Sequence, residues 1–61
     1  MKRGDIVMLQ NDVHHVSGVY KAYSIGLVMK VKMFGNRRVA SVRFSKGLAR
    51  CYCDELEVLN E

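Results

Sequence analysis

The stretch that most constrains the fold is residues 26–44, GLVMKVKMFGNRRVASVRF. Apolar and basic residues mix in its first half, and its second half alternates with a period of two, which is typical of a half-buried strand. Gly35 and Asn36 lie between the halves, and both residue types tolerate the positive φ that tight hairpins require. The stretch therefore predicts two antiparallel strands joined by a tight turn. It also carries five of the ten lysines and arginines of the chain: Lys30, Lys32, Arg37, Arg38 and Arg43.

The sequence on either side of this hairpin predicts three further strands. A first strand is expected over residues 5–9, and a fourth over residues 48–53, after a turn at residues 45–47. Asp54 is placed to cap a single helical turn over residues 54–56, and residues 57–59 then form a fifth short strand. The chain contains no proline, and no segment shows the sustained period of 3.6 residues that marks a helix. A mostly β fold follows.

Residues 10–24, QNDVHHVSGVYKAYS, form the one long connection. Turn signals occur at Asn11-Asp12 and at Ser17-Gly18, but the valines and tyrosines of this segment are too apolar for an unstructured linker. We expect an ordered loop that folds onto the sheet and has room for a short hairpin of its own. Loops of this length in a compact domain often carry binding residues.

The size of the chain limits how its strands can pack. A chain of 61 residues is expected to form one domain with a small core. Five short strands do not provide two packed sheets of useful area, whereas one bent sheet that closes on itself buries one face and hides most edges. The predicted fold is a five-stranded barrel over residues 1–61, with one short 3-10 turn before the last strand. Its predicted core consists of Val7, Leu9, Val28, Ala40, Val42, Phe44, Cys51 and Leu56.

Four short motifs follow the order found in SH3-like barrels. They are GDIV at residues 4–7, GLV at residues 26–28, VRF at residues 42–44 and DELEV at residues 54–58. The chain resembles two branches of these barrels: the KOW-type domains of ribosomal proteins and transcription factors, and small photosynthetic subunits such as photosystem I subunit IV. The first resemblance implies binding to RNA, DNA or polymerase, and the second implies docking of an acidic protein such as ferredoxin. The chain has no tryptophan for a peptide groove, so proline-rich ligands are not expected.

Charge is segregated along the chain. Residues 1–53 hold ten basic and two acidic residues, a net charge of +8, whereas residues 54–61 hold four acidic residues and no basic one. A basic body attracts a polyanion, either nucleic acid or an acidic protein surface, although a solvated basic surface would also keep a small protein soluble. Arg37 and Arg38 are expected to matter most, because charges at the tip of a turn are least hindered. The predicted binding residues are Lys30, Lys32, Arg37, Arg38, Arg43, Arg50 and Tyr52.

Two classes of partner fit this surface. In the preferred interpretation, lysines and arginines contact the phosphates of RNA or DNA, and Tyr20, Tyr23 or Tyr52 stacks on an unpaired base. In the alternative, the surface binds an acidic protein, and Met33 or Phe34 is an exposed docking contact. That alternative describes an accessory subunit of an electron-transfer complex, or a phage protein that binds a host factor. Either way, the expectation is a binding module without enzymatic activity, cofactor or small-molecule substrate.

Catalytic, metal-binding and membrane roles are not expected. The spacing of Cys51, Cys53, His14 and His15 matches neither a nucleophile–base pair nor a zinc site. A Cys51–Cys53 disulfide is disfavoured, because extended positions two apart place their Cα atoms about 7 Å from each other. The first residues lack the apolar core of a secretory signal, and no apolar run approaches the roughly 20 residues of a membrane span. A cytoplasmic location with reduced thiols is therefore expected.

Overall fold

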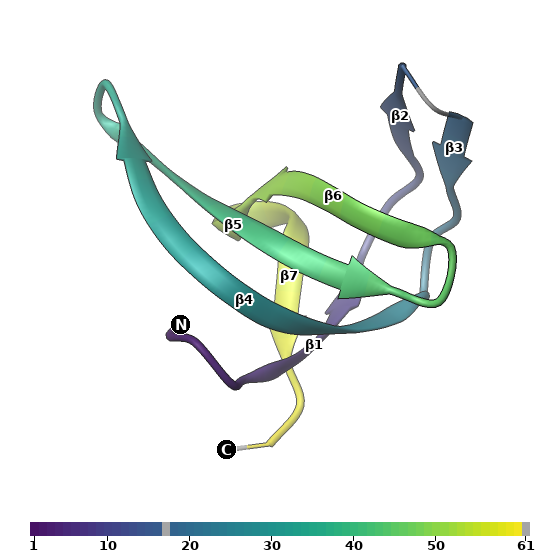
Figure 1. Cartoon of the computed structure of the whole chain (residues 1–61), viewed down its shortest axis with the longest axis horizontal. Helices are drawn as coiled ribbons and strands as arrows, with labels where there is room; N and C mark the ends of the chain where they lie inside the picture. The colour runs from purple at the N-terminus through teal and green to yellow at the C-terminus, as the bar shows by residue number, and fades with distance from the viewer. Residues whose placement is uncertain (17, 61) are drawn as a thin grey trace.

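The structure, a computed structural model, describes residues 1–16 and 18–60 and contains two antiparallel sheets. The larger sheet has the strand order β6-β5-β4-β1-β7 (Figure 1). Its strands are β1 (Ile6–Leu9), β4 (Ile25–Phe34), β5 (Arg37–Phe44), β6 (Gly47–Tyr52) and β7 (Leu56–Val58). The smaller sheet is the hairpin of β2 (Val13–His15) and β3 (Gly18–Tyr20), which lies inside the long connection between β1 and β4. The predicted mostly β class and the five-stranded sheet are confirmed.

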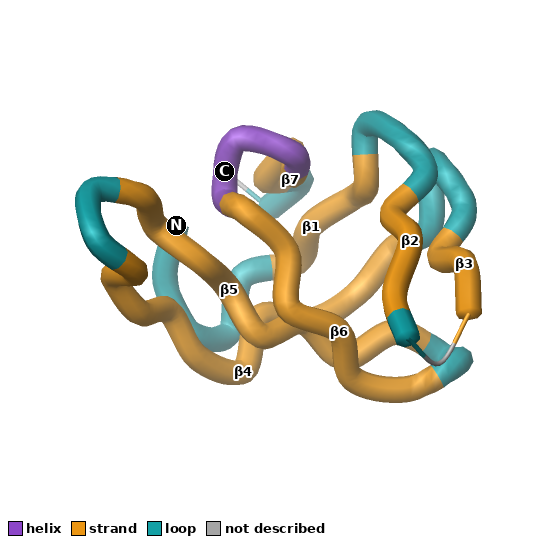
Figure 2. Tube along the Cα trace, turned by 90° about the horizontal axis from the view of Figure 1, so that it is seen from above, coloured by secondary structure: helices purple, strands orange, loops and turns teal. Residues whose placement is uncertain are grey.

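The large sheet is strongly bent, but hydrogen bonds do not close it into a barrel. Its two edge strands, β6 and β7, do not pair with each other in the part of the chain that the structure describes. A 3-10 turn, η1 (Cys53–Glu55), carries the chain from one edge to the other. Figure 2 shows the sheet curving from β6 through β5 and β4 to β1, with η1 close to β7.

Several predicted elements are present with shifted ends. The strand predicted over residues 48–53 begins at Gly47 and ends at Tyr52, and the 3-10 turn begins one residue earlier than expected. The prediction that Asp54 caps this turn is wrong, because Asp54 lies within it. Instead, the backbone N–H of Tyr52 donates to the Glu55 carboxylate at 3.0 Å. The turn predicted at Ser17-Gly18 includes residue 17, which lies outside the described residues.

The tight turn between β4 and β5 forms where it was predicted, at Gly35 and Asn36. Gly35 has a φ of 62°, the left-handed conformation that glycine adopts without steric cost, whereas Asn36 does not have a positive φ. One of the two residues therefore supplies the backbone geometry that the hairpin needs.

A β-bulge at Met29 decides which face of β4 each following residue occupies. Between Val28 and Lys30 the pairing with β5 shifts by one residue, so Met29 is a surplus residue on β4. Strict alternation from the buried Val28 would direct Lys30 and Lys32 into the core. The bulge reverses this phase, so both lysines are exposed and Val31 packs against the core instead.

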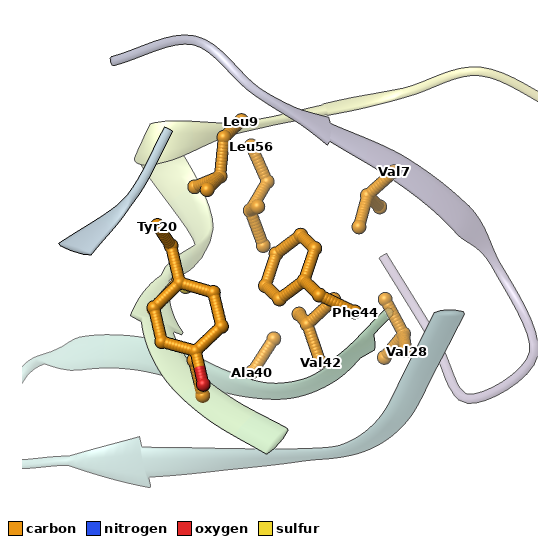
Figure 3. Packing of buried hydrophobic residues seen from close by; sticks show 10 residues of the cluster. Val7, Leu9, Tyr20, Val28, Ala40, Val42, Phe44 and Leu56 are labelled. Atoms are coloured by element: carbon orange, nitrogen blue, oxygen red, sulfur yellow. The ribbon is translucent and has the colours of Figure 1, made fainter. Parts of the chain in front are cut away.

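The core lies on the inner face of the bent sheet, and all eight residues predicted for it are buried. Tyr20 and Ala49 complete the cluster. The ring of Tyr20 packs against that of Phe44, with 5.4 Å between the ring centroids, and Figure 3 shows both rings among the aliphatic side chains. The Tyr20 hydroxyl donates to the backbone carbonyl of Leu48. Tyr20 therefore attaches the β2–β3 hairpin to the sheet, and the prediction that it stacks on a base is wrong.

Asp5 links stability to pH. Its side chain is buried, and its carboxylate accepts hydrogen bonds from the backbone N–H and the Nζ of Lys2, both at 3.0 Å. These bonds, the backbone one first, hold the pKa of Asp5 below its ordinary value. The stabilisation is therefore fully present above the unfolded-state pKa of about 3.9, and it disappears as the pH falls through the lower folded-state pKa.

Replacing Asp5 by asparagine is expected to reduce stability at pH 7 and to flatten the acid limb of the stability profile. The reason is that Asp5→Asn keeps an acceptor oxygen but loses the charge that strengthens both bonds. Urea unfolding of the two proteins between about pH 7 and pH 2 measures this effect. The two curves of unfolding free energy against pH should converge at low pH, where Asp5 of the parent chain becomes protonated. Two parallel curves would show that Asp5 is not the linked group.

Candidate functional site

The outer face of β4, β5 and β6 carries rows of side chains that cross the three strands. Residues directly opposite each other in antiparallel strands point to the same face of the sheet. The register places two neighbouring rows on this face: Lys30–Ser41–Arg50 and Lys32–Val39–Tyr52. A further row, toward the β5–β6 turn, is Leu27–Arg43–Leu48. We call Lys30, Lys32, Arg43, Arg50 and Tyr52 the basic face.

The basic face is exposed and uninterrupted by negative charge. Each of its four cationic residues is exposed, and β4, β5 and β6 contain no aspartate or glutamate. Neighbouring strands lie about 4.8 Å apart, so the Cα atoms of Lys30 and Arg50 lie about 10 Å from each other across β5. The structure thus brings together six of the seven residues that the sequence predicted for binding: these five and Arg37, which contacts Tyr52 on the same face.

Lys30 and Lys32 repel each other on this face. The neighbouring Lys32 lowers the pKa of Lys30, through a hydrogen bond that only the neutral amine of Lys30 can accept and through charge repulsion. Like charges held close together disfavour the charged form of either group. An anion bound between the two ammonium groups would relieve the repulsion, so this pair favours a negatively charged ligand.

Arg37 lies on the same outer face but has partners of its own. Its guanidinium carbon lies 3.5 Å from the centroid of the Tyr52 ring, and its Nη2 lies 3.3 Å from Oδ2 of Asp54. The exposed ion pair contributes little to stability. The position of Arg37 has a steric effect, because its guanidinium covers one face of the Tyr52 ring. A base would stack on the guanidinium plane, or on the ring after Arg37 moves away.

Arg38 lies apart from the basic face. Arg38 directly follows Arg37 in β5 and pairs with Met33 of β4. Because successive residues of a strand point to opposite faces, Arg38 points to the other side of the sheet from Arg37. There its Nη2 donates to the backbone carbonyl of Met1 at 3.1 Å. The two tip arginines are therefore on different faces, and each already contacts another part of the chain.

Met33 and Phe34, whose placement the sequence left open, are both 60% exposed. Because they are successive residues of β4, they point to opposite faces of the hairpin tip. Tyr23, the remaining candidate for stacking, is also exposed, and its backbone has a φ of 70°. These three side chains contribute nothing to the core cluster and are free to contact a partner.

Sequence reasoning missed a groove between the β2–β3 hairpin, the tip of β4–β5 and η1. It is open and has a volume of about 780 Å³. Its lining residues are Asp12, Val13, His14, Phe34, Gly35, Val39, Arg50, Tyr52 and Glu55. Arg50 and Tyr52 belong to both surfaces, so the groove adjoins the basic face. The sequence signals for it were the apolar content of the long connection and the predicted binding residues Arg50 and Tyr52.

The two cysteines are free thiols, and Cys51 is buried. Burial, together with the charges of Glu55 and Cys53, raises the pKa of the Cys51 thiol to about 11. It therefore stays protonated at neutral pH and is a poor nucleophile. Within residues 1–16 and 18–60, no three His, Cys, Asp or Glu side chains gather as metal ligands would. No helix among these residues is long and apolar enough to cross a membrane.

Comparisons of this chain with protein-family models, curated proteins and solved structures found no match. The features of the chain that bear on its function are therefore the cross-strand rows, the exposed cations and the neighbouring aromatic side chains.

Proposed function

We propose that this chain is a small non-enzymatic module that binds the backbone of RNA or DNA through its basic face. The observation that carries the proposal is the set of four exposed cations on three adjacent strands that contain no carboxylate. Phosphates attract such a surface irrespective of base sequence. The lowered pKa of Lys30 supports an anionic ligand at the same place.

Aromatic side chains next to these cations support contact with unpaired bases. Tyr52 lies in the row of Lys32, and Phe34 lies beyond it toward the hairpin tip. Base–aromatic stacking tolerates every base, because each base has a π face. No group on the face is arranged to read the edge of a particular base. The proposed binding is therefore weakly sequence-specific and favours single strands over duplexes.

We also propose that the fold is a small SH3-like barrel. The strand order β6-β5-β4-β1-β7, the hairpin in the first connection and the 3-10 turn before the last strand all support this assignment. It agrees with the resemblance to SH3-like barrels that the motifs suggested. The free thiols support a reducing, cytoplasmic setting.

Fluorescence anisotropy with labelled oligonucleotides tests the proposed function. The intact chain is titrated into a single-stranded RNA, its DNA counterpart and the matching duplex. Four phosphate contacts predict that affinity for the single strands falls about 50-fold between 50 and 200 mM salt. Dissociation constants weaker than about 1 mM at 50 mM salt would contradict the proposal. A pull-down from lysate, with and without nuclease, then shows whether nucleic acid mediates any protein captured.

A further inference from the structure

Next to the Lys30–Ser41–Arg50 row, a row of four exposed side chains, three apolar and one charged, crosses four strands of the sheet. Ile6 of β1 lies opposite Leu27, Leu27 lies opposite Arg43, and Arg43 lies opposite Leu48. These four residues therefore point to the same outer face (strands in Figure 2). We call Ile6, Leu27, Arg43 and Leu48 the outer apolar row. At about 4.8 Å per strand, it spans about 14 Å along the curved sheet.

The fold does not use the apolar members of this row in its core. Ile6 is 43% exposed, Leu27 is 41% exposed and Leu48 is 61% exposed. The neighbouring residues Val7 and Val28 supply the inward contacts of their strands. Single exposed apolar residues are ordinary, but three in one row of a sheet, two of them directly opposite each other, form a patch that is typical of an interaction surface. The row therefore needs an explanation other than stability.

The charged residues in and next to the row indicate what kind of partner binds it. Arg43 is its only charged member, and Lys30 and Arg50 occupy the next row toward the hairpin tip. The nearest carboxylate in the register is that of Glu57, at the β7 edge opposite Met8. A partner that buries this surface therefore gains from carboxylates placed beside its apolar side chains.

Two other occupants fit less well. Phosphates and sugars gain little from leucine and isoleucine side chains, so nucleic acid does not explain Leu27 and Leu48. A second copy of this chain would bring two surfaces centred on Arg43 together, and each chain carries a net charge of +4. Repulsion between like charges opposes that contact.

We propose that the outer apolar row docks a protein segment whose apolar side chains are flanked by carboxylates. This surface is separate from the groove and overlaps the basic face at Arg43 alone. Arg43 belongs to both the row and the basic face, so its substitution does not distinguish them. Leu27 and Leu48 do distinguish them, because neither belongs to the basic face.

The test uses a labelled 18-residue helical peptide with a leucine face flanked by glutamates. One control peptide replaces the glutamates with lysine, and another replaces the leucines with serine. The Leu/Glu peptide is expected to bind the intact chain, and its amide NMR shift changes should centre on Ile6, Leu27 and Leu48. Leu27→Ser and Leu48→Ser should each weaken this binding at least fivefold. The same variants should change oligonucleotide affinity less than twofold.

Four results would overturn the proposal. The first is that the Leu/Glu peptide does not bind at millimolar concentration, and the second is that a control peptide binds as tightly as the Leu/Glu peptide. The third is that the NMR shift changes centre on other residues. The fourth is that Leu48→Ser weakens oligonucleotide binding as much as it weakens peptide binding. A fifth contradicting result would come from sedimentation equilibrium. If the parent chain forms a dimer and Leu48→Ser dissociates it, the row binds a second copy of this chain. Failure of the peptide arm with intact oligonucleotide binding would leave the proposed function standing.

Discussion

Reversing the charges of Lys30 and Arg50 together is expected to weaken oligonucleotide binding by about 100-fold at 100 mM salt. The two side chains lie on either side of Ser41 in one row of the basic face, and both are exposed. Their loss removes two phosphate contacts and adds two repulsive charges. The slope of log affinity against log salt should fall by about 1.4 to 1.8 in magnitude, which anisotropy at several salt concentrations measures.

A matched variant separates this surface from overall charge. Arg3→Glu with Lys21→Glu produces the same net charge of zero as Lys30→Glu with Arg50→Glu, but neither residue lies on β4, β5 or β6. It should weaken binding less than fivefold. Equal losses in the two variants would mean that binding depends on net charge and not on the basic face. Circular dichroism confirms that each variant folds.

The tip arginines provide a second comparison. Arg37→Glu with Arg38→Glu should weaken binding less than the Lys30/Arg50 reversal. Arg37 already pairs with Asp54 and covers Tyr52, and Arg38 points to the other side of the hairpin. This expectation differs from the one that the sequence alone suggested, in which the tip charges dominate. A larger loss from the tip variant would restore the sequence-based hypothesis.

Gly26→Ala is expected to destabilise the fold by about 3 kcal/mol or more. A Cβ at this position would lie 2.5 Å from Cγ1 of Val42, 2.8 Å from Cδ1 of Phe44 and 2.9 Å from the carbonyl oxygen of Arg43. The first two atoms belong to the packed core and the third to the backbone of β5, so relaxation requires the strands to separate. The total stability of a domain this small is only about 3 to 9 kcal/mol. Urea and thermal unfolding should therefore show a midpoint lowered by about 12 °C or more, or no folded state.

Two controls show whether crowding is the cause. Gly35→Ala has open space around its new Cβ and should cost only the strain of its positive φ, about 1 to 2 kcal/mol. In a Val42→Ala background, the additional cost of Gly26→Ala should be clearly smaller, because the closest contact has been removed. Strictly additive costs in this double-mutant cycle would exclude the Val42 clash.

The sequence predicted the core well because alternation reports burial directly. Every apolar residue placed inside, from Val7 to Leu56, is buried. Tyr20 was missed because it follows an irregular connection, where period-two alternation carries no information about the distant ring of Phe44. Its burial depends on where the β2–β3 hairpin docks.

The candidate site was less predictable, because it depends on register and not on composition. The sequence assigned Lys30 and Lys32 to the binding surface, although strict alternation from Val28 directs both side chains inward. The outcome depends on a bulge for which residues 28–30 give no signal. The separation of Arg37 from Arg38 was predictable, because successive residues of a strand point to opposite faces. Which of the two shares a face with Lys30 and Lys32 follows from the register across the turn. The contact of Arg37 with Asp54 joins residues that are distant in the chain.

The surplus residue in β4 makes two properties of the surface separately adjustable. Removal of Met29 would let Val28 and Lys30 follow each other in regular pairing, with Lys30 still opposite Ser41 and still facing outward. Every cation would keep its place, whereas the local twist and bending that a bulge imposes would disappear. A one-residue deletion therefore changes the curvature of the surface without changing its charge. Shape and charge could then be adjusted independently to fit ligands of different form.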